Sequence, residues 1–405
     1  MVNVIGLGYI GLPTALMLAS HGINVVGTDY NKDLVTTLIS GRTTFKEDGL
    51  EKLYSNAVQS GIMFSTEYQI TDTYIVSVPT PYDKFTKKID PVYVVEAVKS
   101  VLEVCKQGSV IVIESTISPG TIDKYIRPII VEAGFEFGES IHLVHAPERI
   151  IPGNMIYELK NNNRTIGADS IIIGERIKKL YSSFCKGEIV VTDIRTAETT
   201  KVVENTFRAV NIAFANELAK ICRYDNMDVY EIIRICNMHP RVNILQPGPG
   251  VGGHCISVDP WFLVGDYSGI AKLIEQSMKI NDGMPDFVLN RIYEIATENS
   301  IEISRIGLYG LTYKENVDDC RESPTLQLLE SQKRHLAQPL KVYDPFIKQD
   351  IVENQYHVFG EFLNDVDFVI IMVKHNEIIE NMEQLTGKTV LDCQNICHLP
   401  QVYKI

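Results

Sequence analysis

A cysteine and a histidine directly follow a loop that contains four glycines. The run from Gln246 to Cys255 reads QPGPGVGGHC, and such a loop lets backbone N–H groups converge on bound atoms. If these groups, or the start of a following helix, face Cys255, the thiolate is favoured and becomes a nucleophile near neutral pH. Spacing alone leaves an inert thiol as the alternative. Asp259 reaches the same pocket if a helical turn begins there, or else it serves as a helix N-cap.

Four polar residues recur along one face of a long predicted helix. Glu198, Lys201, Asn205 and Arg208 are three or four residues apart within the apolar-periodic stretch 196–223, so they project from the same side. An amine and a carboxamide one turn apart suit oxyanion binding and proton exchange, and a guanidinium suits phosphate. The alternative is a solvated helix face with one salt bridge.

A second glycine-rich run follows a short apolar run at the start of the chain and precedes a helical pattern. Its glycines let backbone amides approach a pyrophosphate at a helix N-terminus. The next predicted strand ends at Asp29, where a carboxylate accepts hydrogen bonds from both ribose hydroxyls of adenosine and repels a 2′-phosphate. We therefore predict that the cofactor is NAD rather than NADP. The expected cofactor-binding residues are Gly6, Gly8, Tyr9, Ile10, Gly11 and Asp29.

Two threonines lie just beyond predicted strand ends. Thr80 belongs to VPTP and Thr116 to EST, and ligands of parallel sheets bind outside the carboxyl ends of the strands. Both are candidates to line the cofactor, with ordinary turn hydroxyls as the alternative.

The elements that must position these residues follow an α/β pattern. Short apolar runs alternate with amphipathic stretches up to about Val191 and again after Ser304, which predicts parallel sheets covered by helices. We predict an α/β fold of two Rossmann-like doubly wound domains, joined by a long central helix and a helical middle domain. The predicted domains are an NAD-binding domain 1–195, a central helical domain 196–298 and a C-terminal α/β domain 299–405.

Composition excludes several classes of protein. Apolar residues make up 45% of the 405 residues, and 38 basic against 51 acidic residues give a net charge of −13, which disfavours a nucleic-acid or anionic-membrane binder. No apolar run is long enough to span a bilayer, and the N-terminus lacks signal-peptide features, so we expect a cytoplasmic protein. The eight cysteines are scattered, which indicates reduced thiols. Cys393, Cys397 and His398 lack a second cluster, so we expect no metal site.

Seven motifs in order resemble the nucleotide-sugar 6-dehydrogenases, the UDP-glucose/GDP-mannose dehydrogenase family. The resemblance covers essentially the whole chain, and it implies that 196–298 is a dimerisation domain and 299–405 a UDP-sugar-binding domain. The motifs are GLGYIGLP, VPTP, ESTISPGT, APERIIPG, TAETTKVVENTFRAVNIAFANE, HPRVNILQPGPGVGGHCISVDPWF and GLTYKENVDDCRESP.

The resemblance implies a four-electron oxidation of the sugar C6 alcohol to a carboxylate with two NAD. Cys255 would add to the intermediate aldehyde, and the thiohemiacetal would be oxidised to a thioester that water hydrolyses. Lys201 would exchange the proton on the C6 oxygen and stabilise the oxyanion, aided by Asn205. Asp259 and Glu148 would organise the hydrolytic water.

The resemblance also implies the remaining contacts. Arg321 of DDCRESP would contact the cofactor, and the residue matching Arg241 reaches across a subunit boundary in relatives, so a homodimer or larger homo-oligomer is implied. The expected substrate-binding residues are Arg149, Ile150, Lys201, Asn205, Arg208, His239, Arg241, Gly252, Tyr313 and Lys314.

The motif wording is most similar to the UDP-N-acetyl-D-mannosamine dehydrogenase branch. Where the UDP-glucose branch has a second glutamate in the APER motif, this chain has Pro152. The expected substrate is therefore a UDP-N-acetylhexosamine, oxidised to a uronic acid for surface polysaccharide. The alternatives are a UDP-N-acetyl-D-glucosamine 6-dehydrogenase, a two-electron hydroxyacid dehydrogenase that needs no thiol, and a non-catalytic binding protein.

Overall fold

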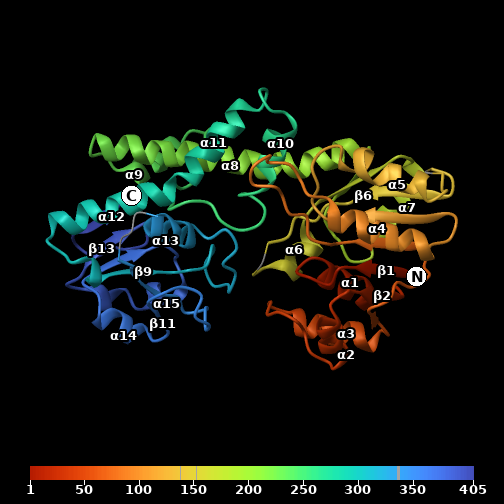
Figure 1. Cartoon of the computed structure of the whole chain (residues 1–405), viewed down its shortest axis with the longest axis horizontal. Helices are drawn as coiled ribbons and strands as arrows, with labels where there is room; N and C mark the ends of the chain where they lie inside the picture. Colours follow the sequence, from red (N-terminus) through yellow and green to blue (C-terminus); the bar gives the residue numbers. More distant parts are fainter. Residues whose placement is uncertain (137, 152, 335–337) are drawn as a thin grey trace. The chain divides into compact units, whose positions relative to one another are not determined.

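The computed structural model describes residues 1–136, 138–151, 153–334 and 338–405. It divides into two compact units, unit 1 (Met1–Glu204) and unit 2 (Asn205–Ile405), each with its own α/β sheet (Figure 1). The predicted fold class, two Rossmann-like domains with a long helix and a helical region between them in the chain, is confirmed. The three domain boundaries given above remain a prediction.

Unit 1 is built on an eight-stranded sheet with the order β3-β2-β1-β4-β5-β6-β7-β8. Most of its strands are short, Val/Ile-rich and buried throughout, as is typical of parallel strands covered by helices on both faces. The strands are β1 Val2–Ile5, β2 Val25–Thr28, β3 Met63–Ser65, β4 Thr73–Val76, β5 Ser109–Ile113, β6 Ile141–His145, β7 Arg164–Ala168 and β8 Ile189–Thr192. The helices are α1 Gly11–Ser20, α2 Lys32–Ile39, α3 Leu50–Gln59, α4 Val92–Val104, the π-helical η1 Ile122–Ile126, α5 Arg127–Glu132, α6 Met155–Asn161 and α7 Ile171–Tyr181.

Two adjacent strands, β7 and β8, depart from the predicted parallel sheet, because β8 runs parallel to β7. β7 runs antiparallel to β6, with Val144 opposite Ala168 and His145 opposite Gly167. The chain leaves β6 at its carboxyl end, and α6, which is only about 10 Å long, does not carry it back to the opposite edge. β7 therefore starts, at Arg164, on the edge where the neighbouring parallel strands end.

The predicted long helix is α8, Ile194–Tyr224, which starts in unit 1 and ends in unit 2. Its first turns are fixed by Glu198, whose carboxylate accepts the backbone N–H groups of Gly120 at 2.5 Å and Ile122 at 3.0 Å. In the described part of the chain, neither α8 nor any other helix has the length and apolar character that a bilayer crossing requires.

Unit 2 is built on a six-stranded parallel sheet with the order β11-β10-β9-β12-β13-β14. Its strands are β9 Ile306–Tyr309, β10 Lys341–Tyr343, β11 Gln355–Tyr356, β12 Phe368–Ile371, β13 Thr389–Asp392 and β14 Val402–Lys404. Its helices after α8 are α9 Val229–Cys236, α10 Asp259–Asp266, α11 Lys272–Asp282, α12 Met284–Glu298, η2 Ile303–Arg305, α13 Pro324–Arg334, α14 Phe359–Asn364, α15 Asn376–Glu380 and η3 Met382–Leu385. Alternate residues of β12 belong to two different apolar clusters, so both faces of this sheet are covered.

The two sheets repeat one arrangement. The strand order of unit 2 matches that of β3-β2-β1-β4-β5-β6 in unit 1. In both units a glycine in a left-handed conformation follows the first strand of the chain order, Gly6 at φ +86° and Gly310 at φ +101°. A Cβ on Gly6 would lie 2.4 Å from the Ser77 carbonyl oxygen, and one on Gly310 would lie 2.6 Å from Val373 Cβ. Close approach of neighbouring strand ends thus requires glycine at both positions.

We expect Gly11→Ala to destabilise unit 1 and Gly8→Ala to leave its stability unchanged. A Cβ on Gly11 would lie 1.8 Å from the backbone oxygen of Gly6, whereas a Cβ on Gly8 would meet no atom within 4 Å. The backbone clash should cost about 2 kcal/mol or more, measurable as a lower denaturation midpoint. Equal midpoints for the two variants would contradict this account of the turn.

Candidate functional site

The first glycine-rich run forms the turn between β1 and α1, as predicted. The Asp29 carboxylate closes this turn, since its Oδ2 accepts the backbone N–H of Leu7 at 2.7 Å while its Oδ1 accepts that of Asn31 at 2.9 Å. Among the described residues, apart from the chain neighbours of Gly8, no atom lies within 4 Å of the position where a Cβ on Gly8 would point. An open backbone at a helix N-terminus, with a carboxylate after the second strand, fits the pyrophosphate and ribose of NAD.

The two threonine-bearing segments are joined by a serine hydroxyl. Ser115 Oγ accepts the backbone N–H of Val78 at 2.9 Å and donates to the Val78 carbonyl at 2.7 Å. Thr80 is buried and Thr116 is half-buried. This bond fixes both segments at the carboxyl edge of the sheet, and cofactor contact by either threonine remains a prediction.

The polar stripe on α8 is largely buried. Glu198, Lys201 and Asn205 are 1%, 6% and 6% exposed, and only Arg208 is an exposed member. The solvated-face alternative is therefore wrong for the first three. Burial of an amine and a carboxamide one turn apart is costly unless they have partners, which favours a role in a site.

Asn205 is hydrogen-bonded to the predicted catalytic aspartate within unit 2. Its Nδ2 donates to Asp259 Oδ2 at 2.6 Å, and Asp259 is only 3% exposed. Asp259 is the first residue of α10, while Val258 is the N-cap, so the N-cap alternative is wrong. The Asp259 N–H donates to the Cys255 carbonyl at 2.8 Å, and Cys255 is exposed. The cysteine thus lies in the turn that leads into α10.

The glycines before Cys255 let the loop lie directly against Tyr313. Cβ atoms on Gly252 and Gly253 would come within 2.6 and 2.8 Å of the Tyr313 side chain, and the Gly253 N–H donates to the Arg321 carbonyl at 2.9 Å. Burial raises the pKa of Tyr313 to about 12, so its hydroxyl remains a hydrogen-bond donor at neutral pH. Three predicted ligand residues, Gly252, Tyr313 and Arg321, are therefore neighbours.

Glu148 lies in a buried charged cluster of unit 1 that the sequence did not reveal. Its carboxylate accepts the backbone N–H of Arg149 at 2.7 Å and is bonded to the Arg164 guanidinium. Arg164, which is 5% exposed, is also 3.9 Å from Glu114, and its guanidinium lies over the Tyr181 ring at 4.6 Å. The Tyr181 hydroxyl donates to Glu114 at 2.9 Å. The antiparallel direction of β7 brings Arg164 to these strand-end carboxylates.

One guanidinium in this cluster faces two carboxyl groups. Burial and, to a lesser extent, the nearby charge of Glu148 raise the pKa of Glu114 to about 7, against the lowering effects of Arg164, Tyr181 and Thr14. Oε2 of Glu114 is buried and has no hydrogen-bond partner among the described residues. Glu114 therefore carries a proton below about pH 7, and the Arg164 guanidinium lies closer to Glu148 than to Glu114.

The other predicted substrate residues are distributed differently. Arg149 donates to Thr165 Oγ1 at 2.7 Å and pairs with Glu204 at 3.1 Å. Three more cationic or imidazole side chains are exposed, namely those of Arg208, His239 and Arg241, whereas Ile150 is buried and Lys314 is half-buried. Pro152 lies outside the described residues. Among the described residues, no group of three His, Cys, Asp or Glu side chains is arranged to hold a metal ion.

We expect Glu114→Gln to remove a pH-dependent loss of stability. Because the pKa of Glu114 is raised in the folded state to about 7, folding favours the protonated form, whose stabilising contribution is complete below about pH 4.5 and is lost by about pH 7. Relative to the variant, the wild-type protein should lose on the order of 3 kcal/mol between pH 4.5 and 8, measured by denaturant unfolding. Glu103→Gln, at an exposed position on α4, serves as the control and should track the wild type. A parallel pH dependence of Glu114→Gln and the wild type would refute the assignment.

Comparison with known proteins gives full-length relatives. Family models match residues 1–185, described as the UDP-glucose/GDP-mannose dehydrogenase family NAD-binding domain, 195–283, its central domain, and 307–399, its UDP-binding domain. A UDP-N-acetyl-D-mannosamine dehydrogenase of Methanococcus vannielii is 41% identical over 98% of this chain and 92% of its own length. An NDP-N-acetyl-D-galactosaminuronic acid dehydrogenase of Ralstonia nicotianae is 38% identical over 98% of this chain and 96% of its own length.

The structure has solved neighbours with the same fold. The native structure of a UDP-N-acetyl-mannosamine dehydrogenase from Staphylococcus aureus matches 100% of this chain and 97% of its own with a TM-score of 0.89 and 40% identity. The predicted family resemblance and the predicted cofactor are thereby confirmed. This chain belongs to the UDP-glucose/GDP-mannose dehydrogenase family and is an NAD-dependent nucleotide-sugar dehydrogenase.

Proposed function

We propose that this enzyme oxidises UDP-N-acetyl-D-mannosamine at C6 to UDP-N-acetyl-D-mannosaminuronate, a precursor for surface polysaccharide. Support for the sugar comes from the names of relatives about 40% identical to the chain, such as that of Methanococcus vannielii. Support for the reaction comes from the family and from the buried residues of α8 and α10. A relative named for another N-acetylhexosamine, with 38% identity, makes the sugar the part of the proposal that most needs a test.

The proposed chemistry passes through a covalent bond to Cys255. The C6 alcohol loses a hydride and a proton to give an aldehyde, and the thiol adds to that carbon to give a thiohemiacetal. A second loss of hydride and proton gives a thioester, and water then releases the carboxylate and the free thiol. NAD, when bound, accepts one hydride in each oxidation, so two NADH form per acid. The covalent bond keeps the aldehyde from escaping between the two oxidations.

The buried polar residues supply proton transfer and charge stabilisation. Lys201 exchanges the proton on the C6 oxygen, and the Asn205 carboxamide, one helical turn later, stabilises the developing oxyanion. Asp259, held by Asn205 at 2.6 Å, organises the hydrolytic water together with Glu148. The Arg164 guanidinium pairs with Glu148.

Cationic side chains and the loop that carries Tyr313 bind the dianionic nucleotide sugar, although the net charge of the protein is negative. Tyr313 and Lys314 bind the nucleotide diphosphate. Arg208 and Arg241 are exposed, so their charges are not desolvated before they bind phosphate. Asp29 holds the adenosine ribose of NAD.

The observation that carries the proposal is the Asn205–Asp259 hydrogen bond. It fixes the turn that bears Cys255 to α8, the helix that bears Lys201. A thiol held in this way supports covalent chemistry over a two-electron dehydrogenase, which needs no thiol, and the buried lysine on the same helix supports catalysis over a binding protein.

The sugar is tested by NADH formation from UDP-N-acetylmannosamine, UDP-N-acetylglucosamine, UDP-glucose and GDP-mannose in parallel, with no epimerase present. We expect a preference for the first and two NADH per acid, because both oxidations occur at one carbon. A preference for the second would support the alternative UDP-N-acetyl-D-glucosamine 6-dehydrogenase. A ratio of one NADH per product would contradict the mechanism.

Cys255→Ser should lower turnover on the order of 10³-fold. A serine hydroxyl does not ionise near neutral pH as a thiol does, so the covalent adduct that the second oxidation needs does not form. Cys236→Ser, which changes another exposed thiol of unit 2, should turn over as the wild type does. Near-normal turnover of Cys255→Ser would favour a two-electron hydroxyacid dehydrogenase.

We also propose a homodimer or larger homo-oligomer assembled through α8. Large apolar side chains recur every seven residues and remain exposed, with Phe207 66%, Phe214 50% and Ile221 50% accessible. Such a heptad row is typical of a helix that packs against another helix. Phe207→Glu/Phe214→Glu should therefore shift the molar mass measured by light scattering to that of a single chain. An unchanged mass would refute this interface.

A further inference from the structure

The first turn of unit 2 is closed in the same way as the NAD-binding turn of unit 1. Asp344 follows β10 as Asp29 follows β2, and its Oδ2 accepts the backbone N–H of Leu311 at 2.6 Å, just as Asp29 accepts that of Leu7 at 2.7 Å. The position that binds ribose in a dinucleotide fold is thus occupied by aspartate in both units.

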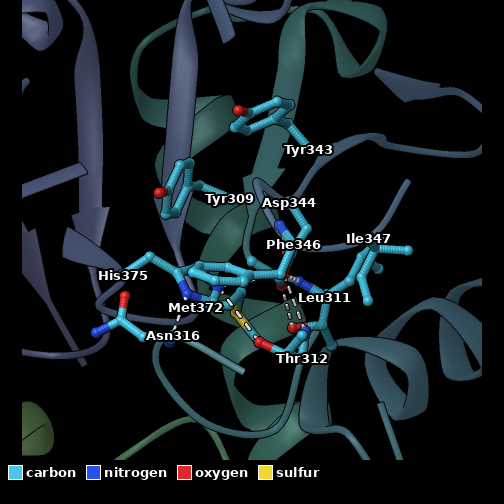
Figure 2. Close-up of polar contacts among 12 residues, drawn as sticks. Tyr309, Leu311, Thr312, Asn316, Tyr343, Asp344, Phe346, Ile347, Met372 and His375 are labelled. Carbon is cyan, nitrogen blue, oxygen red and sulfur yellow. Dashed lines mark hydrogen bonds and ion pairs between the residues drawn. The ribbon is translucent and has the colours of Figure 1, made fainter. Parts of the chain in front are cut away.

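The two aspartates differ in what else they can bind. Asp29 is 8% exposed to solvent. Asp344 is buried, with no exposed side-chain surface, and its Oδ2 also faces the Thr312 N–H at 3.1 Å and His375 Nε2 at 3.2 Å (Figure 2). His375 therefore bonds to this carboxylate, whose burial leaves no surface for the ribose of a second dinucleotide.

The hydrogen bonds of His375 assign the donor and acceptor roles of its two ring nitrogens. Its Nδ1 accepts the backbone N–H of Asn316 at 2.9 Å, so the single proton of the neutral ring lies on Nε2 and points to Asp344. The Phe346 ring lies 5.0 Å from the imidazole, centroid to centroid, and the side chain has no exposed surface. His375 thus connects the rigid strand-end carboxylate to the far end of the loop (Figure 2).

The loop between these points carries Tyr313 and Lys314. At its start Thr312 Oγ1 donates to the Lys314 carbonyl at 2.9 Å. At its end Asn316, with φ at 58°, exchanges hydrogen bonds with Asn376 at 3.1 and 3.0 Å. The start of the loop is therefore held by Asp344, which follows β10, and its end by His375 and Asn376, which follow β12.

We propose that His375 is a positioning residue for nucleotide binding, which holds the 312–316 loop so that Tyr313 and Lys314 meet the UDP group. The inference rests on the proposed function in that it takes these two residues as ligands of the nucleotide sugar. The inference assigns to Asp344, which corresponds to Asp29 of unit 1, the role of anchoring this loop through His375.

The test is calorimetric titration of the full-length enzyme with UDP and, separately, with NAD. His375→Leu removes the acceptor for the Asn316 N–H and should weaken UDP binding about tenfold. His375→Asn places an oxygen near the position of Nδ1 and should restore most of the affinity. NAD affinity should stay unchanged in both variants, and the KM for the nucleotide sugar should rise more than kcat falls.

Two further variants keep the test decisive if His375→Leu folds poorly. Asn316→Gly tolerates the positive φ, removes only the exchange with Asn376 and should also weaken UDP binding. His357→Leu is the matched control, since His357 pairs with Asp350 at 2.7 Å on the surface of the same unit, and its UDP affinity should equal that of the wild type.

Several results would overturn the inference. These are wild-type UDP affinity in His375→Leu, or equal losses in the Leu and Asn variants, or a matching loss of NAD affinity. If the wild-type enzyme itself fails to bind UDP, the proposed function fails with the inference, whereas UDP binding that ignores His375 removes the inference alone.

Discussion

Charge that is buried at the carboxyl edges of the two sheets must find partners inside the protein, and the rest of the structure depends on this constraint. Strand ends converge at these edges, and with them come carboxylates, an imidazole and a guanidinium that water does not reach. An unpaired ion there costs several kcal/mol. Each such group therefore fixes a loop, a helix start or another side chain, and the resulting hydrogen bonds shape the site.

The same constraint explains the reversed direction of β7, which β8 follows. Glu148 follows β6 and Glu114 follows β5, so two carboxyl groups meet at one edge with no cation on either strand. The reversed direction of β7 brings Arg164 to that edge, where the Tyr181 ring covers it. The predicted parallel continuation would have placed this arginine at the opposite edge and left the glutamates unneutralised.

The two units show how one architecture serves two ligands. Their strand orders and first turns agree, but the space beside Gly8 is open, whereas in unit 2 Thr312 takes the corresponding position and His375 closes the carboxylate. Unit 1 thus keeps the backbone and the acid that NAD requires. Unit 2 uses the same acid to support a loop that packs against the glycines before Cys255.

Local patterns determined much of this protein. The glycines at Gly6–Gly11 with Asp29, the apolar strand runs and the helical spacing of α8 are properties of adjacent residues, and they predicted the fold class and the cofactor. The motifs that contain Lys201 and Cys255 predicted the family. A helix of 31 residues was predicted to within two residues at its start and one at its end because its periodicity is unbroken.

The tertiary structure decided the partners. Asn205 and Asp259 are 54 residues apart, Glu114 and Tyr181 are 67 apart, and His375 and Asn316 are 59 apart. Whether Glu198, Lys201 and Asn205 faced solvent or a site could not be read from their spacing, because helical periodicity defines a face but not what covers it. Likewise, an apolar run predicts a strand but not its direction, since a buried strand of either direction presents the same residues to both faces of the sheet.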